Sequence, residues 1–174
     1  EDTWYWGMEA EREFQGLING TITQEKPEQP LIELMKSMRG YLGECSMLAY
    51  LAMMAPRLLE LRRVLKDTGS IYLHCDPTAS HYLKLVVDSI FGVNNFRNEI
   101  IWCYETGGRG KRHFPRKHDN IFWYSKTDKY LFIYDEVSIP RDTSTMHEPI
   151  LYDENNKPYQ RNIKNGKEYR YYLD

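Results

Sequence analysis

The sequence predicts an α/β fold, with helices packed on a mixed sheet that contains an antiparallel pair of strands. Three observations predict it. Apolar residues recur at helical spacing over residues 31–65, a short apolar run at 70–75 follows a Thr-Gly turn, and two more β runs come after another helical stretch. Hydrophobic residues make up 41% of the 174 residues and charged residues 28%, which is typical of a globular chain.

Apolar spacing predicts four helices. A short helix is expected within residues 1–20, and a second begins at Pro30 and ends at Gly40 or Gly43. The stripe over residues 47–65 predicts a longer helix, and residues 82–91 predict another that ends at Gly92. These helices supply the apolar faces that a sheet needs for its core.

The β runs are short and mostly apolar. Residues 70–75 are bounded by a glycine turn and by Asp76-Pro77, as a buried strand would be. Residues 98–105 and 119–126 predict two more strands, separated by a loop too long for a tight hairpin turn. Residues 130–134 predict a further strand that forms a hairpin with the run at 119–126.

Composition narrows the function classes. The cysteines Cys45, Cys75 and Cys103 lie far apart, so the sequence predicts no metal site, no disulfide framework and a reduced, cytoplasmic protein. No apolar stretch is long enough to span a bilayer, so no membrane partner is expected. Because the net charge is only −2, a nucleic-acid surface would have to come from local clusters of Lys and Arg. The chain begins without Met, which predicts a processed or truncated protein.

The loop between the runs at 98–105 and 119–126 gathers basic residues beside three glycines. Such a loop would present positive charge to phosphates, and the glycines would allow a close approach. The candidate DNA-binding residues are Arg109, Lys111, Arg112, Arg116 and Lys117. A solvated loop with no partner explains the same charges equally well, so both interpretations stay open.

A candidate base pocket is predicted where the strands meet this loop. Asp76 follows the strand at 70–75, and ligands of open α/β sheets bind at the carboxyl ends of strands. Its more common role would be to cap the following helix. Trp102 and Tyr104 could wall a flipped base, although most aromatic residues on strands belong to the core. His118 is the fourth candidate of this pocket.

Several segments together resemble one protein family. The sequence is similar to consecutive segments of the β-group DNA amino-methyltransferases at residues 57–76, 81–84, 88–92, 95–102 and 117–126. These enzymes modify adenine N6 or cytosine N4 and include the modification subunits of type III restriction systems. The resemblance covers roughly residues 50–126. It implies a partial Rossmann-like methyltransferase fold, DNA as partner, a restriction-modification context and S-adenosylmethionine as the cofactor of the complete enzyme. In that family the amino nitrogen of a flipped base attacks the methyl carbon of the cofactor.

Two motifs of that family are absent from the sequence. Asp76-Pro77 is followed by Thr78-Ala79 rather than by Pro and an aromatic residue, and no Phe-x-Gly-x-Gly turn is present. We therefore expect a middle piece of the enzyme, with no catalytic residue in this chain and no assignable cofactor residues. Residues 1–134 would be a partial catalytic domain, and residues 135–174 the start of a target-recognition or extension region.

The resemblance and the missing motifs leave several functions open. The chain would be inactive alone unless a completing half of the enzyme, or a homo-oligomer, supplied the rest. The alternatives are a non-catalytic nucleic-acid-binding module that uses the basic loop at 109–118, and an interaction piece whose apolar faces meet another polypeptide.

Overall fold

The computed structural model describes residues 4–105, 112, 114, 116–138, 150–164 and 167–173, with only the backbone at 162–164. The chain divides into two compact units, Glu1–Phe132 and Ile133–Asp174. The first contains the predicted helices and strands, and the second is a small sheet. The boundary and the roles expected for residues 1–134 and 135–174 stay predictions.

The four predicted helices are present in the first unit: α1 (Met8–Ile18), α2 (Gln29–Leu42), α3 (Ser46–Val64) and α4 (Ser80–Phe91). Gly40 lies inside α2, and α2 ends instead at Gly43, whose φ of 69° is accessible to glycine without strain. Gly92 ends α4 in the same way, with φ 86°. No helix in the described part of the chain has the length and apolar character that a membrane crossing requires.

The three predicted strands form one sheet, made of β1 (Ser70–Cys75), β2 (Phe96–Cys103) and β3 (His118–Ser125) in the order β1-β3-β2. Both pairings are antiparallel, so the α/β class and the antiparallel pair are confirmed. The sequence predicted a mixed sheet, but the described strands of this sheet include no parallel pair. In this register Leu73 lies opposite Phe122, and Trp102 lies opposite Asp119.

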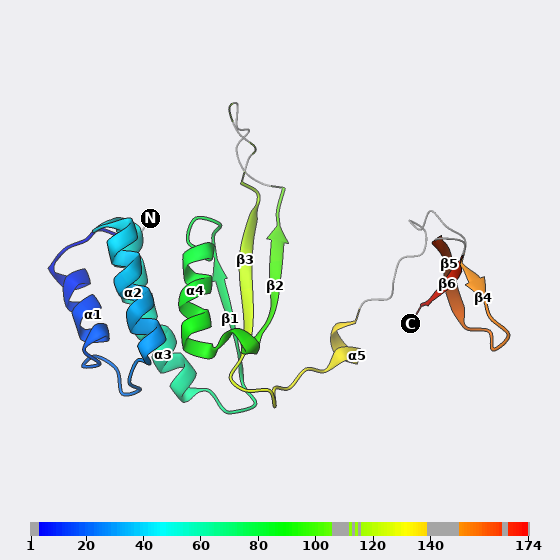
Figure 1. Cartoon of the computed structure of the whole chain (residues 1–174), viewed down its shortest axis with the longest axis horizontal. Helices are drawn as coiled ribbons and strands as arrows, with labels where there is room; N and C mark the ends of the chain where they lie inside the picture. Colours follow the sequence, from blue (N-terminus) through cyan, green and yellow to red (C-terminus); the bar gives the residue numbers. More distant parts are fainter. Residues whose placement is uncertain are drawn as a thin grey trace. The chain divides into compact units, whose positions relative to one another are not determined.

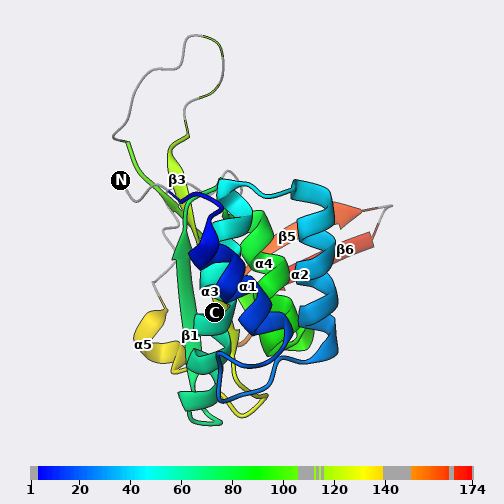
Figure 2. The same cartoon turned by 90° about the vertical axis from the view of Figure 1, so that its left-hand side faces the viewer.

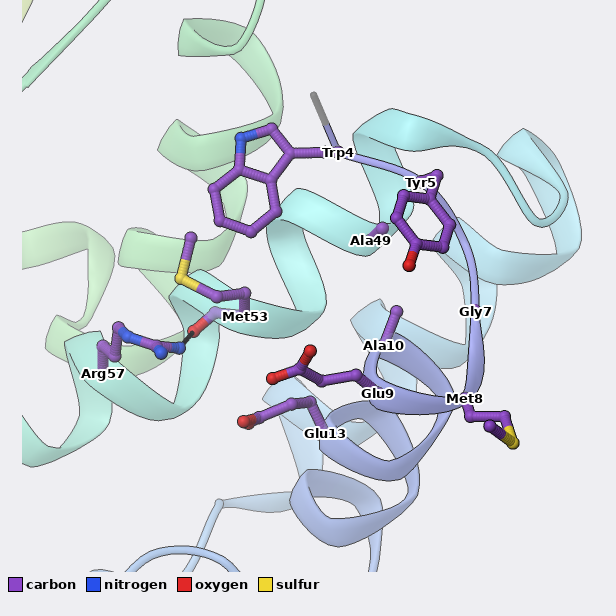
Figure 3. A pocket seen from close by; sticks show the side chains of 10 residues that line it. All are labelled: Trp4, Tyr5, Gly7, Met8, Glu9, Ala10, Glu13, Ala49, Met53 and Arg57. Atoms are coloured by element: carbon purple, nitrogen blue, oxygen red, sulfur yellow. Dashed lines mark hydrogen bonds between the residues drawn. The ribbon is translucent and has the colours of Figure 1, made fainter. Parts of the chain in front are cut away.

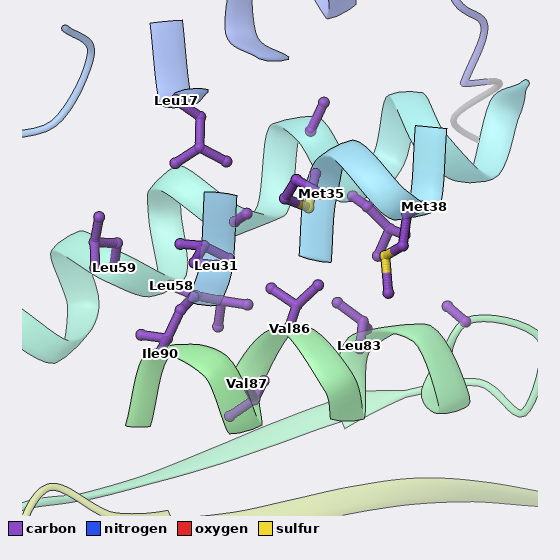
Figure 4. Close-up of a cluster of buried hydrophobic side chains, with 14 of the residues drawn as sticks. Leu17, Leu31, Met35, Met38, Leu58, Leu59, Leu83, Val86, Val87 and Ile90 are labelled. Carbon is purple, nitrogen blue, oxygen red and sulfur yellow. The ribbon is translucent and has the colours of Figure 1, made fainter. Parts of the chain in front are cut away.

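All four helices lie on one face of this sheet (Figures 1 and 2), with α4 between the strands and the pair α2 and α3. Leu83 and Val86 of α4 point toward those helices, whereas Val87 points toward the strands (Figure 4). All three side chains are fully buried. Burying an apolar side chain of this size stabilises the fold by about 1.5–3 kcal/mol, so α4 is the central element of the core.

A buried polar contact fixes α4 to the middle strand. Tyr124 of β3 is fully buried, and its hydroxyl donates a hydrogen bond to Oδ1 of Asp88 on α4 at 2.7 Å. Lys84 Nζ donates to both oxygens of the same carboxylate, at 2.8 and 2.7 Å. Burial raises the pKa of Tyr124 far above its ordinary value, and Asp88 raises it further. The hydroxyl therefore stays protonated and remains a donor.

The N-terminal segment is held by Arg39 of α2. Its guanidinium donates to both oxygens of Glu11 on α1, at 3.0 and 2.9 Å, and lies 5.0 Å from the rings of Trp6 and Phe14. These hydrogen bonds lower the pKa of Glu11. Arg39 thus ties α1 and α2 together and places the chain just before α1, including Trp4.

The prediction of a strand at residues 130–134 is wrong. Residues 130–133 have no regular structure, and a short helix, α5 (Tyr134–Val137), follows them. The aromatic side chains of this run pack on the sheet instead of pairing with it, since Tyr130 and Phe132 lie 5.7 and 5.1 Å from the ring of Trp123. Alternating aromatic residues fit both arrangements, so the pattern alone could not separate them.

The second unit contains a separate antiparallel sheet. Its strands are β4 (Leu151–Tyr152), β5 (Pro158–Lys164) and β6 (Lys167–Tyr172), in the order β4-β5-β6. Tyr159 is its one buried apolar residue among those described, and its ring lies 5.7 Å from that of Tyr172.

We expect Tyr124→Phe to lower the free energy of unfolding of the chain by about 1 kcal/mol, because it removes one buried hydrogen bond and keeps the ring. Urea unfolding of the two proteins measures the difference. Tyr72→Phe is the matched control on the exposed face and should change stability by less than about 0.5 kcal/mol. Equal stability of Tyr124→Phe and the unaltered chain would show that the contact to Asp88 contributes nothing.

Candidate functional site

A pocket of about 440 Å³ opens at the carboxyl end of β1. The end of β1, the first turns of α3, the turn before α4 and the segment before α1 form its walls. Its lining residues are Trp4, Ser46, Met47, Tyr50, Cys75, Asp76, Thr78 and Ala79. The carboxyl end of a strand is the usual place for a ligand in an α/β sheet, which makes this the candidate site.

Asp76 caps the turn that leads into α4. Its Oδ1 accepts hydrogen bonds from the backbone N–H groups of Thr78 and Ala79, at 3.1 and 3.0 Å, and its carbonyl accepts one from Ser80 N. Asp76 thus closes the turn before α4, whereas the N-cap position of the helix itself, Ala79, has no side-chain cap. Oδ2 has no hydrogen-bond donor within the part of the chain that the structure describes, so the exposed carboxylate also leaves one acceptor on the pocket wall.

The other titratable groups of the pocket are uncharged at neutral pH. Burial raises the pKa of the Cys75 thiol to about 12, and the nearby carboxylates of Asp76 and Glu99 add to the effect. Burial also raises the pKa of Tyr50, with smaller contributions from Cys75 and Asp76. The pocket wall is therefore neutral apart from Asp76, and Cys75 is not a thiolate nucleophile.

An aromatic and polar cluster lies on the opposite face of the sheet, at the same end of the strands. Asp119 of β3 contacts His74 Nε2 through Oδ2 at 2.9 Å, and its Oδ1 accepts a hydrogen bond from the Tyr104 hydroxyl at 3.4 Å. The ring of Trp102 lies 5.8 Å from that of His74 and is 56% exposed. Trp102 and Tyr104 are thus surface residues, not sheet core, and Asp119 links all three strands.

The predicted pocket residues are only partly brought together. Trp102 and Tyr104 share the cluster around Asp119, whereas His118 lies opposite Cys103, and the alternation of β3 turns its side chain to the other face. Asp76 lies on the pocket wall. Burial raises the pKa of the Tyr104 hydroxyl, and the negative charges of Asp119 and, to a smaller extent, Asp76 raise it further. Asp76 is therefore close enough to the cluster to act on it electrostatically.

Sequence reasoning missed His74 and Asp119 as site residues. They are 45 positions apart, and they meet only because β1 and β3 are neighbours in the sheet. The single sequence signal was that His74 precedes Asp76 at the strand end. Nothing in the sequence shows that β3 lies between β1 and β2.

The basic loop joins this region through its stem. Arg116 Nη1 donates to Oγ1 of Thr78, a residue of the pocket wall, at 3.3 Å. Lys117 Nζ donates to the Glu105 carbonyl at 2.8 Å. Arg112 is exposed, and Arg109 and Lys111 lie outside the described residues. Of the predicted cations that the structure describes, Arg116 thus contacts the pocket wall, and Lys117 contacts the other side of the loop stem.

A second pocket, of about 350 Å³, lies between α1 and α3. Figure 3 shows Glu9 and Glu13 of α1 on one side and Arg57 of α3 on the other, with the Arg57 guanidinium donating to the Met53 carbonyl at 2.6 Å. Trp4 lines both pockets, and its ring lies 5.6 Å from that of Tyr50. No residue that the sequence predicted for a site lies in this second pocket.

A family model described as DNA methylase matches residues 20–172, which is most of the chain. The chain belongs to the DNA methylase family. The match includes α2, α3 and α4, the strands of the first sheet and the strands of the second, so the family match extends through both units of this methylase chain. The resemblance inferred from residues 50–126 is confirmed.

Individual relatives of the methylase chain are similar over its central part. The type II methyltransferase M.KpnI of Klebsiella pneumoniae is 35% identical over 80 residues, which is 45% of this chain and 19% of that protein. M.EcaI of Enterobacter cloacae is 37% identical over 86 residues, 48% of this chain and 19% of that protein. The type III restriction-modification enzyme StyLTI Mod subunit of Salmonella typhimurium is 33% identical over 92 residues, 53% of this chain and 13% of that protein. The matched part of the methylase chain thus spans a fifth or less of each of these relatives.

We expect the cysteines of the methylase chain to differ sharply in reactivity. Cys103 is exposed, whereas the pKa of Cys75 is about 12, so at pH 8 only about one Cys75 in ten thousand is a thiolate. Brief treatment with iodoacetamide should alkylate Cys103 and leave Cys75 intact, as mass spectrometry of the peptides would measure. The same treatment in urea should label both. Equal labelling of the folded chain would contradict the burial of Cys75.

Proposed function

We propose that this chain is part of a DNA amino-methyltransferase, which transfers a methyl group from S-adenosylmethionine to an exocyclic amino group of adenine or cytosine in duplex DNA. The cytoplasm and a restriction-modification system would be its setting. The observation that carries the proposal is the contact between Arg116 and Thr78, because it joins the basic loop to the pocket at the end of β1. The family and the two type II methyltransferases support the same reaction.

The basic loop would hold the DNA backbone. Among the described residues, no acidic side chain forms an ion pair with Arg112, Arg116 or Lys117. The side chain of Arg116 donates to a neutral hydroxyl, and that of Lys117 donates to a backbone carbonyl. Their charges are therefore available to phosphates even though the whole chain carries a net charge of −2. Arg109 and Lys111 would extend this contact. Phosphate contacts of this kind position DNA without reading its sequence.

The cluster around Asp119 would form one wall for the flipped base. Trp102 offers an exposed indole face on which a base can stack. Asp119 holds His74 from β1 and Tyr104 from the end of β2, which fixes the neighbours of that indole. Asp76, which follows β1 at the same end of the sheet, would supply a further acceptor for the amino group, through the carboxylate oxygen that the turn leaves unused.

The residues of the pocket at β1 do not fit the whole cofactor. S-adenosylmethionine carries a carboxylate and an ammonium group, and the pocket at β1 contains no cationic side chain and one carboxylate that already accepts two backbone hydrogen bonds. The chain also has no Phe-x-Gly-x-Gly turn. We therefore assign it no step that involves the cofactor, and we propose that other parts of the enzyme hold the methyl donor.

The uncovered face of the first sheet supports completion by further polypeptide. Tyr72 is 56% exposed and stacks on Trp123 at 5.6 Å, and Phe132 lies beside them on the same face. A sheet with apolar residues on both faces is normally covered on both. A completing half of the enzyme would cover these aromatic residues, and self-association would cover them in the chain alone.

The reading frame that encodes the chain tests the proposal. We expect it to continue on the amino-terminal side into a Pro-Pro-aromatic motif, and on the carboxyl-terminal side into a Phe-x-Gly-x-Gly turn. The polypeptide it encodes should transfer a labelled methyl group to duplex DNA. A reading frame that begins and stops with this chain would contradict the proposal that the chain is part of an enzyme. Binding of that chain to duplex DNA would then favour the alternative, a non-catalytic DNA-binding module.

In the complete polypeptide, we expect Trp102→Ala to lower kcat/KM for DNA about 10- to 100-fold, because base stacking contributes about 1–3 kcal/mol. Trp102→Phe should retain most of the activity, since it keeps an aromatic face. Methyl transfer at several DNA concentrations measures both. Tyr41→Ala is the control, because Tyr41 is an exposed aromatic residue of α2 away from the sheet. Unchanged kinetics for Trp102→Ala would remove this residue from the base pocket.

A further inference from the structure

The hairpin of β5 and β6 brings like charges together. In its register Arg161 lies opposite Arg170, so one opposed pair is cation against cation. Opposed residues of an antiparallel pair have Cβ atoms about 4.5–5.5 Å apart, and like charges at this distance are destabilising. An anion bound between the two arginines would relieve this repulsion.

The chain itself neutralises little of this charge. Residues 157–172 contain five Lys and Arg residues and one acidic residue, Glu168. Glu168 Oε1 accepts from Arg170 Nε at 3.2 Å, whereas exposed Arg161 has no acidic partner among the described residues. One cation of the arginine pair is therefore partly balanced, and the other is not.

The surroundings of the arginine pair match a phosphate ligand. Opposed residues share a face of the sheet, so the pair Tyr159 and Tyr172 lies on the same face as the two arginines. The Arg170 guanidinium lies 5.0 Å from the Tyr159 ring, which orients it, and Tyr172 is half exposed beside it. Arginine and tyrosine side chains are common donors to DNA phosphates.

We propose that the β5–β6 hairpin binds the phosphate backbone of DNA, with Arg161 and Arg170 as the contacting residues and Lys167 beside its turn. The inference rests on the proposed function, because DNA is the polyanion on which that function acts. It adds a second contact surface, in a different unit of the chain from the basic loop. The family match extends through β6, which supports a role for the hairpin in the same protein.

Salt-dependent binding of the full 174-residue chain to DNA tests this surface. The probe is a fluorescein-labelled duplex of about 25 base pairs, followed by anisotropy between about 50 and 200 mM NaCl. Each lost phosphate contact should lower the slope of log K against log salt by about 0.9. We expect this decrease for Arg161→Gln and for Arg170→Gln, and retention of the slope for Arg161→Lys.

The controls separate a DNA contact from a structural effect. Arg12→Gln removes the same charge from an exposed position of α1 and should leave the slope unchanged. Arg112→Gln in the basic loop should lower the slope independently. The melting temperature of Arg161→Gln should stay equal or rise, because a like-charge pair is removed. Lys167→Gln is a second hairpin variant that leaves the arginine pair in place.

The possible results distinguish this inference from the proposed function. Unchanged slopes for the Arg161, Arg170 and Lys167 variants, with a lower slope for Arg112→Gln, would overturn the hairpin contact and keep the loop. No binding of the unaltered chain to the duplex at low salt would contradict both DNA surfaces. A decrease of the same size for Arg12→Gln would show only a general charge effect and would also overturn the hairpin contact.

Discussion

The position of every candidate site residue in the first unit depends on the burial of α4 between the sheet and the other helices. Leu83 and Val86 pack toward α2 and α3, Val87 packs toward the strands, and the contact from Tyr124 to Asp88 fixes the distance between α4 and β3. The turn that precedes α4 is capped by Asp76, so the same packing sets the wall of the pocket. The shape of the pocket at the end of β1 is thus a consequence of how α4 is held.

The proposed DNA contacts depend on local charge rather than on net charge. The chain is slightly acidic overall, and several acidic residues of its helices form ion pairs, as Glu11 does with Arg39 and Glu60 with Arg63. The cations at the loop stem and Arg161 of the hairpin have no such partners in the described part of the chain. Helix charges therefore stabilise the fold, and the unpaired cations remain available for a polyanion.

The elements that the sequence predicted well are those whose ends have a local cause. The strand at 70–75 lies between a glycine turn and Asp76-Pro77, and its bounds are as predicted. Contacts that depend on strand order could not be predicted, because His74 meets Asp119, and Arg161 meets Arg170, only through the register of the sheets. The run at 130–134 was misassigned because its aromatic residues pack on Trp123 in place of pairing.

The central claim is that this chain supplies the DNA-facing wall of a methyltransferase and not the cradle of its cofactor. Isothermal titration of S-adenosylmethionine into the isolated chain tests it most directly. We expect no heat of binding, because neither the glycine turn nor a cation for the cofactor carboxylate is present at the pocket of β1. Micromolar binding at one site per chain would contradict the account, since it would require a cofactor site built from residues that we assign to DNA.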